Sequence, residues 1–233
     1  MSLSEVPQFF FGVNASVELL AALAAFLITL FGFKVYNYTS ERKYYWFSAA
    51  FGLITVSFLA SSLVHLLIYL NFRETSIDLF NLIGFGVVSF YVVLLITAYQ
   101  LILAVATDAH NKKLMMFILL LSFVLIFTSS KVWDTFLVVA FITTLFIAIN
   151  FFEKFTKRTT GFSLLIFLSF ASLAIAHGIF VSKLLFPNFT NLFYVIGYLL
   201  MIFSYLLLLV GMLRVLLLKP NNAKVEKNER KKK

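Results

Sequence analysis

The chain has 233 residues, of which 62% are hydrophobic and only 12% are charged, and its formal net charge is +9. Soluble domains carry about 25% charged residues, so this composition excludes a soluble globular protein. The 30 phenylalanines against 9 glycines and 3 prolines exclude collagen-like and low-complexity chains, and the lack of cysteine excludes disulfide frameworks and thiolate chemistry. The composition therefore predicts an all-α, polytopic integral membrane protein.

Seven apolar runs, each bounded by charged or turn residues, predict seven transmembrane helices. They are Phe10–Tyr36, Tyr44–Leu70, Ile77–Val105, Leu114–Ser130, Val132–Phe152, Phe162–Phe186 and Leu192–Leu218. The fourth and fifth runs are separated only by Thr128, Ser129, Ser130, Lys131 and Asp134, and one long kinked helix is the alternative. A kink needs a proline or an inserted polar group. All three prolines fall at predicted helix boundaries and none lies near this point, so we predict a tight turn.

The basic residues are distributed unequally between the two ends of these helices. Of 19 Lys and Arg residues, all but Arg73, Lys131 and Lys183 fall on one side. Short cytoplasmic loops are enriched in Lys and Arg, so we predict that the N-terminus is outside and the C-terminus inside the cell membrane. The positive charge then reflects topology and gives no support to nucleic-acid binding. We expect residues 1–218 to form the membrane domain and residues 219–233 a disordered basic cytoplasmic tail.

Two blocks of sequence recur at nearly the same spacing. Ser57–His65 matches Ser169–His177 at an offset of 112, and both blocks begin with Ser-Phe and end in His. Leu79–Phe85 matches Leu192–Tyr198 at an offset of 113. The order and spacing predict a parallel internal repeat of helices one to three and five to seven, with helix four as connector. Helices two and six should then face each other across a pseudo-twofold axis along the membrane normal.

This arrangement resembles the three-plus-one-plus-three architecture of SWEET-type sugar transporters and, more loosely, the seven-helix opsin-like proteins. The resemblance implies a site near the midplane between the two halves. The prolines of the SWEET helices have no equivalent here, because Pro7-Gln8 precedes the first span. Opsins hold retinal on a lysine of the last helix, and Leu192–Leu218 contains no lysine. Ser61-x-x-x-His65 is similar to a motif of the ceramidase-like zinc hydrolases, whose paired histidines on the last helix have no counterpart in this chain.

Ionisable residues inside a membrane span are costly, so each is a candidate functional residue. Glu18 is the one acid well inside a predicted helix, and His65 and His177 are the intramembrane histidines, all three in the predicted outer half. Asn14 lies one turn from Glu18, and Ser61 lies one turn from His65. We predict that these five residues bind a ligand in a polar cavity of the outer half.

The alternative is that these groups hold the helices together. Ser57 and Ser169 share the faces of the two histidines, and we expect them to bond a neighbouring helix. Ala25 and its small neighbours beside Glu18, with Gly84 and Gly197, should allow close helix approach. Each histidine could likewise bond only a neighbouring helix or a backbone carbonyl.

The function that these features favour is binding and transport of a small solute, with the lipid bilayer and the solute as partners. One alternative is a seven-helix sensor that signals through a separate cytoplasmic protein, and another is a membrane protein with His65 and His177 as axial ligands of a haem b. No Ser/His/Asp set, Gly-rich phosphate loop or His-Glu-x-x-His run occurs. We therefore expect no enzymatic activity, no metal and, under the favoured function, no cofactor; whether the chain forms oligomers or binds a protein partner stays open.

Overall fold

The computed structural model describes residues 8–70, 77–108, 112–157 and 159–230, and across these residues the chain is helical with short connections. Its elements are α1 (Gln8–Thr39), α2 (Arg42–Tyr69), α3 (Ile77–Ala106), α4 (Lys112–Thr128), α5 (Val132–Lys157), α6 (Gly161–Ser182), the short 3-10 helix η3 (Pro187–Phe189) and α7 (Thr190–Arg230). Six of the described helices are long and apolar enough to cross a membrane, whereas α4 has 17 residues and is shorter. The all-helical fold class is confirmed.

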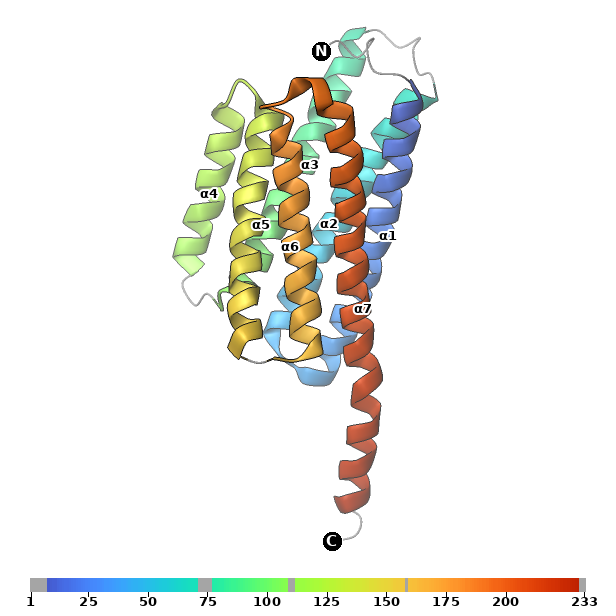
Figure 1. Cartoon of the computed structure of the whole chain (residues 1–233), viewed down its shortest axis with the longest axis vertical. Helices are drawn as coiled ribbons and strands as arrows, with labels where there is room; N and C mark the ends of the chain where they lie inside the picture. The colour runs from blue at the N-terminus through green and yellow to red at the C-terminus, as the bar shows by residue number, and fades with distance from the viewer. Residues whose placement is uncertain (1–7, 71–76, 109–111, 158, 231–233) are drawn as a thin grey trace.

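The helices form a closed ring of six with the seventh outside it (Figure 1). Around the ring, α1, α2, α3, α5, α6 and α7 each pack against the next, and α7 closes the ring on α1. The short α4 packs only on α3 and α5. In this order α2 stands opposite α6. The α1–α2 connection, the end of α3 and the end of α5 lie at the end of the bundle from which α7 projects.

The tight turn predicted between the fourth and fifth helices is confirmed. Helix α4 ends at Thr128 and α5 begins at Val132. The Ser129 hydroxyl accepts a hydrogen bond from the backbone N–H of Lys131 at 3.1 Å, and the Thr135 hydroxyl donates to it at 2.7 Å. These bonds satisfy groups that a continuous helix would have paired, so the side chain of Ser129 stabilises the break.

Three helices end more than three residues from the predicted position. Helix α5 ends at Lys157 rather than Phe152. Helix α6 ends at Ser182 rather than Phe186, because the chain turns there before η3 begins at Pro187. Helix α7 continues to Arg230 rather than ending at Leu218, so Pro220 lies within a helix and not at its boundary. Beyond the bundle α7 runs alone (Figure 1). Six of the eight residues 223–230 are Ala, Lys, Glu or Arg, which favour helix and support the continuation beyond Pro220. The first proline, Pro7, lies outside the described residues.

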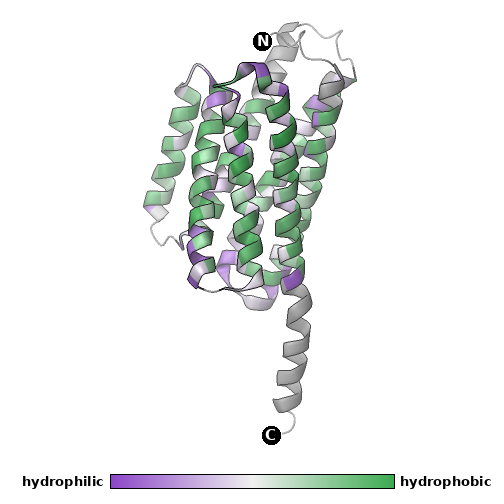
Figure 2. Cartoon of the chain, in the orientation of Figure 1, coloured by the Kyte–Doolittle hydropathy of each residue, from purple (hydrophilic) through white to green (hydrophobic). Residues whose placement is uncertain are grey.

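Apolar residues cover both the interior and the exterior of the bundle. The rings of Phe51 and Phe58 on α2 pack edge-on against Tyr205 on α7, with centroids 6.3 and 5.9 Å apart. Leucines such as Leu20 and Leu199 point outward and are more than half exposed. Figure 2 shows apolar residues along the length of the helices and hydrophilic residues gathered at the two ends. A soluble monomer does not expose so large an apolar surface, and this exterior is that of a membrane protein.

Two serines at matched positions of the sequence make the same kind of bond. The Ser57 hydroxyl on α2 donates to the backbone carbonyl of Tyr91 on α3 at 3.1 Å. The Ser169 hydroxyl on α6 donates to the backbone carbonyl of Ser204 on α7 at 2.7 Å. The donors are 112 residues apart and the acceptors 113, which are the offsets of the two matched blocks. Both serines therefore fasten neighbouring helices, as expected.

Candidate functional site

Glu18 lies in the interface between α1 and α2 and is only 3% exposed. The alanines that follow it along α1, Ala21, Ala22 and Ala25, are also buried. Small side chains let two helix backbones approach closely, and α1 and α2 pack along most of their length. The prediction that these alanines allow close helix approach is confirmed. The close approach of α1 and α2 buries Glu18 between them.

Both oxygens of the Glu18 carboxylate have a partner on α2. The Ser61 hydroxyl donates to Oε1 at 2.9 Å, and Nδ1 of His65 lies 2.8 Å from Oε2. Ser61 and His65 are one helical turn apart, so one face of α2 supplies both groups. An ionised carboxylate in an apolar interior requires such partners, because burial without them is very costly. The structure thus brings together three of the five residues predicted to form the site.

Among the described residues, no side-chain hydrogen bond joins the other two predicted residues to this cluster. Asn14 is half-buried one turn before Glu18, and among the described residues no hydrogen bond joins the two side chains. His177 lies on α6 and is 3% exposed. Its Nε2 atom is 2.9 Å from the hydroxyl oxygen of Tyr99 on α3. The two histidines are therefore held by different partners on different pairs of helices.

His177 belongs to a second polar cluster deep in the bundle. The rings of Tyr99 and His177 meet edge-on with centroids 5.5 Å apart. The Tyr205 hydroxyl lies close to that of Tyr99 at a geometry that makes no full hydrogen bond, and Nδ1 of His177 has no partner within the described residues. Sequence reasoning missed both tyrosines. A tyrosine in the middle of an apolar span is the available signal, because a buried phenol needs a polar partner.

Aromatic side chains connect the two clusters. The Glu18 carboxylate lies within electrostatic range of the hydroxyl groups of Tyr91 on α3 and Tyr198 on α7. The ring of Phe180 on α6 contacts both Tyr198 and His177, with centroids 5.3 and 6.1 Å apart. The two polar clusters thus lie in one bundle, and the apolar ring of Phe180 stands between Tyr198 and His177.

Gly197 sets the closeness of α6 and α7 beside this connection. A Cβ atom at Gly197 would lie 2.4 Å from Cε1 of Phe180, which is far inside van der Waals contact. Glycine is therefore the residue that lets the Phe180 ring pack directly on the α7 backbone. The expectation of close approach at Gly197 is confirmed, whereas the surroundings of Gly84 lie outside the described residues.

An ion pair lies where α5 begins and α6 ends. Nζ of Lys183 at the end of α6 is 3.5 Å from Oδ1 of Asp134 in the first turn of α5, and it donates to the Tyr194 hydroxyl at 3.0 Å. The Lys183 side chain is only 12% exposed. Lys183 is one of the three basic residues on the predicted outer side, and Asp134 neutralises its charge.

A hollow of about 450 Å³ lies between α1 and α2 near Glu18. Its lining includes Ala15, Ser62 and Tyr69, but not Glu18. The Ser62 hydroxyl donates to the backbone carbonyl of Ala15 at 2.8 Å and joins the two helices there.

No family model, curated protein or solved structure matches this chain. The likeness to SWEET-type transporters and opsins therefore stays a resemblance in the order of helices. Within the described part of the chain, no three His, Asp or Glu residues gather closely enough to hold a metal ion.

Proposed function

We propose that this chain is a non-enzymatic transporter of a small solute, with Glu18 and His65 as a proton-binding pair in the transport pathway. One observation carries the proposal: a carboxylate that is 3% exposed is held through both oxygens inside an apolar helical bundle. Ionisable groups at such positions in membrane proteins mark ion, proton or substrate pathways. Fastening α1 to α2 would need no charged group, because the Ser62 hydroxyl already does so.

The geometry supports a coupling role for this pair. With the carboxylate ionised, the Ser61 hydroxyl and the His65 ring hold α2 against α1 through charge-assisted hydrogen bonds. Protonation of Glu18 would remove the charge and weaken both bonds. A proton would then shift the equilibrium between two arrangements of α1 and α2 by the difference in its affinity for each. Tyr91, Tyr198 and the Tyr99–His177 pair would extend the polar pathway across the bundle.

The proposal includes the internal repeat and the orientation. The bonds from Ser57 and Ser169 to equivalent third helices support a duplication of α1–α3 and α5–α7, with α4 as connector. Transporters built from parallel repeats place the site between the halves. The Tyr99–His177 pair joins α3 to α6 across that boundary, whereas the Glu18 cluster lies within the first half. We place the end carrying most basic residues in the cytoplasm, with the chain crossing the cell membrane several times.

The test is solute-driven proton movement in liposomes that contain the purified chain and an enclosed pH-sensitive dye. A panel of sugars, amino acids and carboxylates is added outside, one at a time. We expect at least one solute to acidify the interior, and Glu18→Gln to abolish the signal. Glu153→Gln is the matched control, because Glu153 is exposed near the end of α5. Unchanged proton movement in Glu18→Gln, with folding intact, would refute the proposed role.

A further inference from the structure

A second hollow lies at the end of the bundle from which α7 projects, far along the helices from Glu18. Its volume is about 170 Å³, and five of the six ring helices contribute to its wall. The wall is mainly apolar, with Phe47, Val105, Phe151, Phe162, Ile166 and Met212. The polar lining side chains include Lys43 on α2 and Lys154 on α5.

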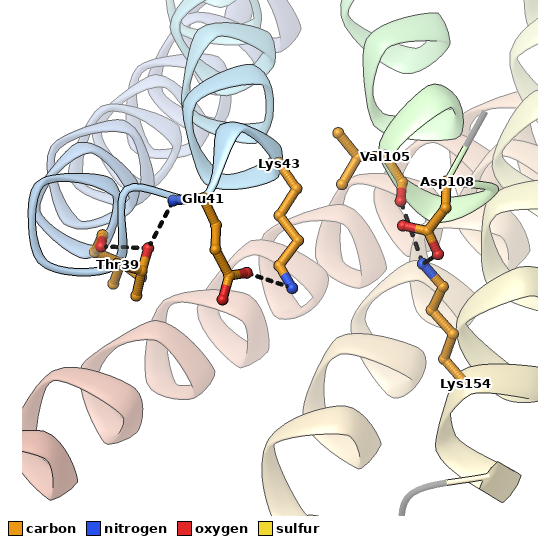
Figure 3. Close-up of polar contacts among 7 residues, drawn as sticks. Thr39, Glu41, Lys43, Val105, Asp108 and Lys154 are labelled. Atoms are coloured by element: carbon orange, nitrogen blue, oxygen red, sulfur yellow. Dashed lines mark hydrogen bonds and ion pairs between the residues drawn. The ribbon is translucent and has the colours of Figure 1, made fainter. Parts of the chain in front are cut away.

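The two lysines reach this hollow from opposite sides, and each is held by a carboxylate (Figure 3). Nζ of Lys43 lies 2.6 Å from Oε2 of Glu41. Nζ of Lys154 lies 2.7 Å from Oδ2 of Asp108 and donates to the backbone carbonyl of Val105 at 3.3 Å. An ammonium group has three N–H donors, so these contacts fix the direction of each lysine and leave a donor for a further acceptor.

Two further features concern the cations at this end of the bundle. Asp108 has a φ of 48°, a left-handed backbone conformation that is costly for a residue other than glycine, and in this conformation it binds Lys154. Gly161 begins α6, and a Cβ there would lie 2.5 Å from Nη1 of Arg214. Because Gly161 has no side chain, the guanidinium of Arg214 can lie against the start of α6, where Phe162 lines the pocket. Arg214 is thus a third cation at this end of the bundle. Exposed ion pairs stabilise folding little, so stability does not account for this placement.

The volume of the hollow and the charged side chains at its rim indicate which kind of ligand fits it. A cavity of about 150 Å³ lined by Leu, Ile and Phe holds one benzene molecule, so this hollow holds an apolar body of similar size. Glu41 and Asp108 balance the charges of Lys43 and Lys154, and Arg214 adds one further positive charge beside the pocket wall. This surplus, with the N–H donors that the two lysines keep, favours a negative charge on the bound body over a positive one. We propose that this pocket binds a small apolar monoanion, a carboxylate of about the size of benzoate, with its apolar part among Phe47, Phe151 and Ile166 and its carboxylate between Lys43 and Lys154.

The proposal is tested by equilibrium binding of radiolabelled benzoate to the purified full-length chain in lipid nanodiscs. Benzamide and benzylammonium have nearly the same shape but are neutral and positive. We expect saturable benzoate binding that benzamide displaces at least about tenfold less effectively and benzylammonium not at all. A charge-assisted hydrogen bond corresponds to a change of about tenfold or more in affinity, so Lys43→Ala and Lys154→Ala should each weaken benzoate binding by that factor.

Three variants complete the experiment. Lys157→Ala removes an exposed lysine from the same end of α5 that does not line the pocket, and it should leave the affinity unchanged. Lys154→Arg keeps the charge and should retain most of the binding. Glu18→Gln should bind benzoate normally, because the pocket is distinct from the proposed proton-binding pair. Equal binding of benzoate and benzamide, or equal losses in Lys157→Ala and Lys154→Ala, would overturn the proposal.

Discussion

Nδ1 of His65 lies 2.8 Å from Oε2 of Glu18, so two ionisable residues from different helices share one bond inside an apolar bundle. The Glu18 side chain is 4% exposed and that of His65 is 24% exposed. A charge pair in such surroundings gives up the hydration of both groups, and its attraction repays that cost only with good geometry and further hydrogen bonds. The Ser61 hydroxyl supplies the further bond. Substituting His65 or Ser61 therefore measures how much each partner of Glu18 contributes to the stability of the protein.

We expect His65→Ala to destabilise the protein more than Ser61→Ala does. The histidine variant leaves a buried carboxylate without its main partner, which costs about 3–5 kcal/mol. The serine variant loses one hydrogen bond to a group that stays paired with His65, at about 1–3 kcal/mol. Thermal unfolding in detergent measures both. If the losses were equal, or the larger one followed Ser61→Ala, His65 would not be the main partner of Glu18.

Ser57→Ala and Ser169→Ala should lower stability by similar small amounts, because both hydroxyls donate to a carbonyl of the next helix. Interhelical hydrogen bonds of this kind contribute about 0.5–1.5 kcal/mol. Thr97→Val is the control, since the Thr97 hydroxyl bonds within its own helix and its loss should be nearly neutral. A clear loss in one serine variant and none in the other would remove this support for the internal repeat.

Gly197→Ala should destabilise the protein by about 1–3 kcal/mol, the usual cost of overpacking. The new Cβ would meet the Phe180 ring, which cannot swing aside because it packs against Tyr194 and Tyr198. The matched control is Gly86→Ala. Nothing lies within 4 Å of a Cβ there, so that variant should be neutral or slightly more stable. Combining Gly197→Ala with Phe180→Leu should recover part of the loss, and a failure to recover any would place the strain elsewhere.

The orientation can be measured directly, because the chain has no cysteine of its own. Asn188 in η3 and Lys157 at the end of α5 are both exposed and lie at opposite ends of the bundle. With an impermeant thiol reagent on intact cells, we expect Asn188→Cys to be labelled and Lys157→Cys to be protected until the cells are opened. The reverse pattern would invert the topology inferred from the basic residues.

The helices of this protein follow from local features of the sequence. Apolar runs of sufficient length predict the helices, and the polar run at Ser129 predicts the break between α4 and α5. The prediction that α7 ends at Leu218 is wrong, because the helix-favouring residues 223–230 can extend a helix that is already formed, even across Pro220. Pro220 therefore did not mark a boundary.

The partners of the polar groups were decided only by the tertiary structure. The sequence singled out Glu18, His65 and His177 by their cost in a membrane, but it paired neither His177 with Tyr99 nor Lys43 with the pocket that Lys154 shares. Helices such as α2 and α6 are apolar on every face, so their sequences carry almost no periodic signal for which side points inward. In a soluble protein, polar residues face water and apolar residues face the core, so the pattern of the two marks the inner face of each helix. Where lipid and core are equally apolar, the direction of a side chain is set by packing and interhelical hydrogen bonds, which exist only once the helices have assembled.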